Sequence, residues 1–306
     1  MKTSIKLQPK RSLRIFIYSV VVFALLKPDS LAYIGLAWLD SLLILIDIFI
    51  LLFVILQLIM QRYKMSGVTV CIILLYSAMT LSTVIVSKDY FTLLKTAGPA
   101  IAMCMFTDFA MQRHPMEYLK SSLKLLCILY TLNFITIILY YPTGMYQTDY
   151  VVGDTYLMGF DNGMIYNLLP MCCYAYICSY VLNNKIFTKQ SIYATVLMLI
   201  SEIYVKSGTG IIQSVLMILF VICINKGWLK NFLNPGIVFI TFYFGTYLLT
   251  IFRIQNYMAN FIGFLGKDLT LTGRTYLWDY AIAVFKQHPI IGIGASGRTV
   301  LGINGH

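Results

Sequence analysis

Long apolar runs separated by short polar segments fill the first 252 residues of the chain. The runs cover residues 15–33, 42–60, 68–86, 93–110, 123–141, 163–182, 192–205, 211–224 and 237–252. A helix of about 20 residues crosses the hydrocarbon of a bilayer, and we expect Pro28 to break the first run. The pattern predicts an all-α polytopic membrane protein with about nine transmembrane helices.

Basic residues alternate between the two ends of the predicted helices. The N-terminus and every second loop contain 14 of the 23 Lys and Arg, whereas the loops between contain only Lys27, Lys88, Lys95 and Lys206. Because Lys and Arg gather in cytoplasmic loops, the N-terminus is predicted to be cytoplasmic. Nine spans then divide the chain into a transmembrane domain, residues 1–252, and a large extracytoplasmic loop, residues 253–306.

The composition fits this picture. Hydrophobic residues make up 59% of the chain and charged residues 11%, whereas a soluble domain contains about 25% charged residues. The net charge of +11 is explained by the loops, so no nucleic-acid partner is expected. All seven Cys lie in apolar runs and are expected to be small apolar fillers. With three His and no zinc or P-loop motif, the sequence predicts no metal ion and no other cofactor.

The extracytoplasmic segment is predicted to fold as amphipathic helices. Apolar residues recur at helical spacing over residues 254–265, which indicates a helix able to lie on the outer leaflet. A second helix begins near Thr272 and ends at His288, which precedes a proline. Gly292 and Gly294 predict turns after it. These glycines match the dinucleotide-binding fingerprint by letter only, because no βαβ unit precedes them.

Arg274 lies in the opening turn of that second helix. Helix N-termini favour anions, so a cation at this position is unfavourable unless an anion is bound beside it. An Arg side chain can bind a phosphate with two parallel hydrogen bonds. Arg274 therefore either holds a phosphate or pyrophosphate, or contacts lipid headgroups.

Four further polar residues lie near the outer ends of spans. Glu202 and Lys206 are one turn apart, so they either neutralise each other or face a substrate, with Lys206 as a second cation. Asp47, about two turns below the outer surface, should face a cavity or a partner helix. Asp161 follows an acidic loop and either caps the next helix or joins the site. With Arg274, these residues place the candidate site on the outer face, where nucleotide sugars and ATP are absent.

Residues 273–294 contain the pattern Gly-Arg-x3-Trp-x2-Ala-x3-Phe-x2-His-Pro-x2-Gly-x-Gly. This pattern resembles the external-loop signature of the O-antigen polymerase and ligase family, and the Ser-Gly-Thr-Gly turn at 207–210 and the order of elements are also similar. The resemblance implies that the substrates are undecaprenyl pyrophosphate-linked glycans, joined to another glycan outside a bacterial plasma membrane without a metal ion. It also implies membrane lipids, a flippase and a chain-length regulator as partners.

The resemblance assigns roles to individual residues. It implies that Arg274 holds the donor pyrophosphate. Where the family often has an Arg after the Ser of the turn, this chain has Gly208, so Lys206 is the expected substitute. The family's loop continues into a His-Asn motif and further spans, whereas this chain ends at His306, so the loop is expected to be incomplete. Glu202 and His306 are the candidate general bases.

We therefore predict a metal-independent membrane glycosyltransferase that polymerises lipid-linked repeat units into a surface polysaccharide. This polysaccharide is a capsule, an exopolysaccharide or an O-antigen. One alternative is a ligase, which differs only in its acceptor. Others are a flippase or exporter of lipid-linked oligosaccharides, and an inactive fragment. A transporter would need charged residues through the full membrane depth, so their clustering on the outer side favours transfer chemistry.

Overall fold

The chain is helical over most of the residues that the computed structural model describes, namely 9–146, 154–161, 163–228, 234–257 and 274–295. Nine helices in these ranges match the nine predicted spans. They are α1 (Pro9–Leu25), α2 (Ala37–Ile59), α3 (Gly67–Ser82), α4 (Tyr90–Arg113), α5 (Pro115–Tyr140), α6 (Ile165–Asn183), α7 (Lys189–Tyr204), α8 (Gly208–Asn225) and α9 (Pro235–Thr250). The helix that carries the motif, α11, covers Arg274–Gln287.

Several helices are suited to a bilayer. Within the described residues, five are long and apolar enough to cross a membrane: α2, α3 with the π-helical turn η2 (Thr83–Ser87) that extends it, α5, α6 and α8. In α2 only 22% of the most apolar window is buried, so most of its apolar side chains face outward, as lipid contact requires. The predicted all-α polytopic membrane fold is confirmed.

The helix ends follow local sequence signals. α1 ends at Leu25, before Pro28, and a short 3-10 helix, η1 (Asp29–Ala32), follows, so the predicted break is confirmed. α9 starts with a proline after Asn234, whose side chain accepts a hydrogen bond from the backbone N–H of Gly236 at 2.8 Å. α11 ends at Gln287, directly before His288, as the following proline predicts.

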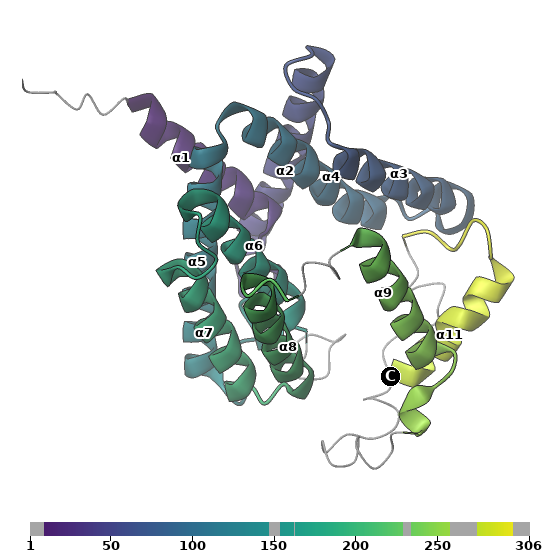
Figure 1. Cartoon of the computed structure of the whole chain (residues 1–306). Helices are drawn as coiled ribbons and strands as arrows, with labels where there is room; N and C mark the ends of the chain where they lie inside the picture. The colour runs from purple at the N-terminus through teal and green to yellow at the C-terminus, as the bar shows by residue number, and fades with distance from the viewer. Residues whose placement is uncertain (1–8, 147–153, 162, 229–233, 258–273, 296–306) are drawn as a thin grey trace, which may run out of the picture. The chain divides into compact units, whose positions relative to one another are not determined.

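The chain divides into two compact units. Unit 1 comprises residues 1–80 and 90–216, and unit 2 comprises residues 81–89 and 217–304. In unit 1, α5 packs against α1, α6 and α7, and α2 packs against α1 and α4 (Figure 1). In unit 2, α9 contacts both α11 and the 3-10 helix η3 (Ile254–Asn256).

A small hairpin folds back onto unit 1 before α6, which the hydrophobic pattern did not predict. Its antiparallel strands are β1 (Thr155–Tyr156) and β2 (Gly159–Phe160). Asn133, fully buried in α5, accepts a hydrogen bond from the backbone N–H of Met158 at 2.9 Å. The Asn167 amide donates to the Met158 carbonyl at 2.7 Å. Two amide side chains from α5 and α6 thus fix the turn of the hairpin.

We predict that Asn133→Ala loosens this hairpin. The substitution leaves a buried backbone N–H without its acceptor, which costs about 1–3 kcal/mol. Amide hydrogen exchange at Met158 should become faster, while Asn183→Ala, at the exposed end of α6, should leave it unchanged. Equal exchange rates in both variants would contradict this role of Asn133.

Candidate functional site

Glu202, near the end of α7, is fully buried. A Cβ atom at Gly210 would lie only 1.7 Å from one of its carboxylate oxygens, so the carboxylate lies over the first turn of α8. Neither oxygen makes a hydrogen bond of good geometry within the described residues. The first turn of α8 contains no acidic residue of its own. The Glu202 carboxyl group therefore lies at a helix N-terminus, the place where a negative charge is favoured.

Lys206 does not neutralise this carboxylate. Among the described residues, the salt bridges do not include one between Lys206 and Glu202. α7 ends at Tyr204, and Lys206 has a φ of 58° with an exposed side chain. The helical i,i+4 geometry is lost at this turn, so the interpretation as a self-neutralising pair is wrong. Lys206 is instead a solvent-facing cation beside the start of α8.

Asp161 lies in the turn after β2, close enough to Glu202 for their negative charges to repel. The interpretation of Asp161 as a helix cap is wrong, because α6 begins at Ile165 and its N-cap residue is Met164. The backbone N–H groups of Gly163 and Met164 bond to the Phe160 carbonyl and form a turn between Asp161 and the helix.

Tyr156 lies close to Asp161. Tyr156 is fully buried, and its hydroxyl has no hydrogen-bond partner among the described residues. Burial raises the pKa of the Tyr156 hydroxyl, and the Asp154 and Asp161 carboxylates raise it further, so this group stays a neutral donor. The rings of Tyr141 and Tyr204 pack edge to face at 5.1 Å. Carboxylates and hydroxyls of this kind can bond sugar hydroxyls.

Asp47 lies apart from this group, on α2. It is 5% exposed, and neither carboxylate oxygen has a hydrogen-bond partner among the described residues. The nearest charges are Lys27 and Asp40, which form an ion pair with a 2.6 Å separation. Asp47 is therefore buried inside unit 1, and the expectation that it faces a cavity or a partner helix stays a prediction.

In unit 2, α11 is described from Arg274 onward, and the residues before it lie outside the described ranges, so the place of Arg274 in the opening turn stays a prediction. Arg253, which lies three residues after α9, was not among the site residues predicted from the sequence. Its Nη2 atom donates to the Thr275 carbonyl at 3.3 Å and to the Asp279 carboxylate. Its guanidinium lies 5.6 Å from the Trp278 ring centre. Arg253 thus joins the end of α9 to the first turns of α11.

Arg253 also has a hydrogen-bond donor that these contacts do not use. Its Nη1 atom is buried and has no hydrogen-bond partner among the described residues. Nothing in the sequence around Arg253, which stands alone after an apolar run, predicts this contact. The only hint of a partner is the carboxylate of Asp279, four residues after Thr275. The residue could hold an anion at the start of α11.

The glycines after α11 allow a close approach to η2. Gly292 and Gly294 have φ values of 72° and 79°, in the left-handed region. A Cβ atom at Gly294 would lie 2.6 Å from the Cα of Thr83, and the backbone N–H of Ala295 donates to the Thr83 hydroxyl at 2.9 Å. These two glycines of the motif therefore allow close backbone packing and do not form a dinucleotide-binding loop.

The remaining expectations concern His306 and metals. His306 lies outside the described residues. Within the described ranges, no three His, Cys, Asp or Glu side chains lie close enough together to hold a metal ion, and metal independence stays a prediction. The seven Cys are free.

Comparisons with known proteins point to one family. Residues 193–304 match the family model described as O-antigen ligase, a range that includes Glu202, Lys206 and Arg274. A segment of 43 residues is 46% identical to the exopolysaccharide production protein ExoQ of Rhizobium meliloti (strain 1021), and it covers 14% of this chain but only 10% of that relative. No solved structure matches the chain significantly. The resemblance to the O-antigen polymerase and ligase family is confirmed.

We predict that Gly210→Ala destabilises the contact between α7 and α8. The added methyl group overlaps the Glu202 carboxylate, and overpacking of this kind costs about 1–3 kcal/mol. The thermal unfolding midpoint in detergent should fall, and the double variant with Glu202→Ala should recover most of the loss. Gly245→Ala is the control, because a Cβ atom there meets no other group within 4 Å. Absence of recovery in the double variant would refute the proposed contact.

We also predict that Gly294→Ala frees the segment after α11. The left-handed backbone costs a non-glycine residue about 1–2 kcal/mol, and the clash with Thr83 adds to this. Gly227→Ala is matched for backbone strain, because Gly227 has a φ of 75° but open space around its Cβ position. Trypsin cleavage at Lys286 should become faster for Gly294→Ala than for Gly227→Ala; equal rates would show that the contact is unimportant.

Proposed function

We propose that this membrane protein polymerises lipid-linked oligosaccharide repeat units into a surface polysaccharide on the outer face of a bacterial plasma membrane. The match of residues 193–304 to the O-antigen ligase model carries the proposal. The similarity of a short segment to an exopolysaccharide production protein supports polysaccharide synthesis. In this proposal the donor is an undecaprenyl pyrophosphate-linked glycan, which arrives already activated at a face without nucleotide sugars.

The reaction forms one glycosidic bond and breaks one bond to phosphate. A hydroxyl oxygen of the acceptor unit attacks the anomeric carbon of the donor's reducing-end sugar. The bond from that carbon to the pyrophosphate oxygen breaks, and undecaprenyl pyrophosphate leaves with the electron pair. The hydroxyl proton passes to a general base of the protein. No oxidant, reductant or nucleotide is required.

Cations of unit 2 would stabilise the leaving pyrophosphate. Arg274 is predicted to lie in the opening turn of α11, where the backbone N–H groups and the helix dipole add to its charge. Arg253 bonds the carbonyl of the next residue, Thr275, and keeps one buried donor without a partner. A pyrophosphate carries several negative charges, so it suits a site to which more than one Arg contributes. Lys206, which is exposed, is proposed as an additional cation.

Acids and tyrosines of unit 1 would bind the sugars. Glu202 is a candidate general base, because its buried carboxylate has no hydrogen bond of good geometry in the described part of the chain. His306 stays the other candidate. Asp161 and the Tyr156 hydroxyl supply an acceptor and a neutral donor for sugar hydroxyls. Asp47, deeper in the bundle, is proposed only to line the path of the substrate.

The ligase remains the second candidate, because the matched family model is described by that activity. The two reactions use the same donor and the same leaving group, and they differ only in the acceptor glycan. A flippase and a chain-length regulator are proposed partners of the polymerase.

We predict that Arg274→Ala abolishes chain growth in a cell that makes the polysaccharide. Loss of one charge-assisted contact to the leaving group should lower the rate by about 100- to 1,000-fold. Single repeat units already displayed outside the cell, measured by gel electrophoresis of surface glycans, would support the polymerase. Lys286→Ala, a charge change in the last turn of the same helix, is the control.

Other outcomes of this experiment are equally informative. Repeat units trapped on the inner leaflet would indicate a flippase. Normal chains that are no longer joined to their final acceptor would indicate the ligase. Unchanged polysaccharide would remove Arg274 from the site.

A further inference from the structure

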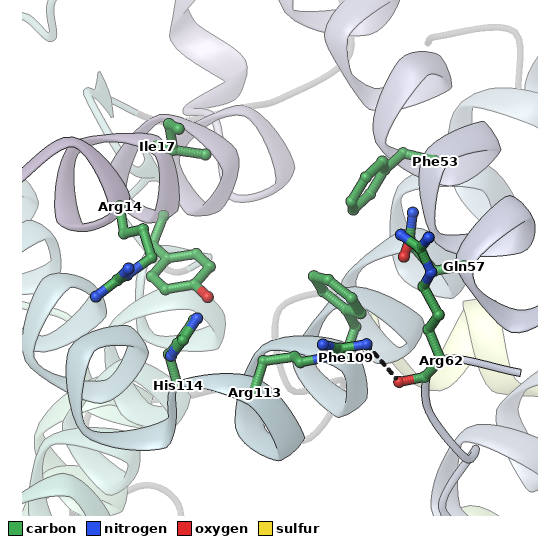
Figure 2. Close-up of a pocket in the computed structure, with 9 residues that line it drawn as sticks. Arg14, Ile17, Phe53, Gln57, Arg62, Phe109, Arg113 and His114 are labelled. Atoms are coloured by element: carbon green, nitrogen blue, oxygen red, sulfur yellow. Dashed lines mark hydrogen bonds between the residues drawn. The ribbon is translucent and has the colours of Figure 1, made fainter. Parts of the chain in front are cut away.

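A cavity of about 370 Å³ lies in unit 1 on the side of the membrane where Lys and Arg gather, away from the candidate site. Figure 2 shows its walls, which come from α1, α2, the turn after α2, the end of α4 and the residue before α5. Three arginines, Arg14, Arg62 and Arg113, line it together with the apolar side chains of Ile17, Phe53 and Phe109.

Two of the three arginines in this cavity keep their charge available. Arg14 is neutralised, because its Nε and Nη2 atoms bond the two oxygens of Glu117 at 2.7 and 3.0 Å. Arg62 and Arg113 take part in no salt bridge among the described residues. The cavity therefore carries about two uncompensated positive charges and can bind an anion.

Arg113 is held in position to do so. Its Nη2 atom donates to the Arg62 carbonyl at 3.1 Å, and its guanidinium lies 5.9 Å from the Phe109 ring centre (Figure 2). Both contacts leave further N–H groups for a ligand. The Arg side chain is thus pre-organised, which lowers the entropy lost when an anion binds.

Part of the wall is apolar and exposed. Ile17 is 46% exposed and Phe53 is 42% exposed, and both lie on helices that match predicted spans. Exposed side chains on spanning helices face acyl chains. A soluble anion would use only the arginines, whereas a phospholipid would use the arginines with its headgroup and the apolar wall with its chain.

We propose that this cavity binds the headgroup phosphate of an anionic phospholipid of the cytoplasmic leaflet, with the acyl chain against Ile17 and Phe53. Basic pockets between transmembrane helices on this side of a membrane suit such headgroups. The bound lipid bridges α1, α2 and α4. This inference is independent of the reaction proposed above.

The test uses the purified full-length chain in mixed micelles, with native mass spectrometry to count retained lipids. Wild type should retain phosphatidylglycerol in preference to zwitterionic phosphatidylcholine. The double variant Arg62→Gln/Arg113→Gln should lose at least about tenfold in retention, because it removes two charge-assisted contacts. The control, Lys120→Gln/Lys124→Gln, makes the same charge change at exposed residues nearby and should behave as wild type.

Three outcomes would overturn the proposal. The first is equal loss in the two double variants, which would indicate attraction by net charge alone. The second is equal retention of the two lipids. The third is displacement of phosphatidylglycerol by millimolar inorganic phosphate, which would indicate a site for a soluble anion. Arg113→Lys, which keeps the charge but loses the planar fork, should retain part of the binding and shows that the fold tolerates a change here.

Discussion

Backbone N–H and C=O groups inside a bilayer must find partners within the protein, because no water is available there. This constraint confines non-helical backbone to the helix ends. The left-handed residues Lys206 and Arg253 lie two and three residues after the ends of α7 and α9, and the π-helical turn η2 extends α3. The residues proposed for chemistry lie at such ends, where the constraint is relaxed and polar side chains can turn toward a substrate.

Hydrophobic runs were sufficient to predict the helices, because an apolar run of this length has few other stable conformations in a bilayer; within the described residues, five of the helices are long and apolar enough to cross a membrane. The end of α11 at Gln287 was predictable for a similar reason, since the stop signal at His288 and the following proline is local in sequence. The contacts made by Asn133 and Arg253 were not predictable, because each partner lies more than 20 residues away in the chain. Glu202 and Lys206 show how a sequence pattern can mislead. Their spacing predicts an ion pair only if the helix continues through both residues, and α7 ends at Tyr204.

Glycines in the Ser-Gly-Thr-Gly turn and in the motif of residues 273–294 allow other groups to approach the backbone closely, because they have no side chain. Gly210 makes room for the Glu202 carboxylate at the start of α8, and Gly294 makes room for the backbone of Thr83. A motif made of such residues specifies close approach between segments far apart in sequence. It therefore identifies a family more readily than it identifies the groups that react.

A glycosyl transfer with a pyrophosphate leaving group needs two kinds of charged group. An anionic base must lie near the acceptor hydroxyl, and cations must lie near the phosphate. The carboxylates Glu202 and Asp161 belong to unit 1, whereas Arg253 and Arg274 belong to unit 2. A cation whose donors are all used by a carboxylate would have none left for the substrate. In unit 2, Asp279 instead binds the Nη2 of Arg253 and leaves Nη1 free of partners within the described residues. One acid then orients the cation while part of its donor capacity is kept for an anion, an arrangement consistent with phosphate recognition and with release after transfer.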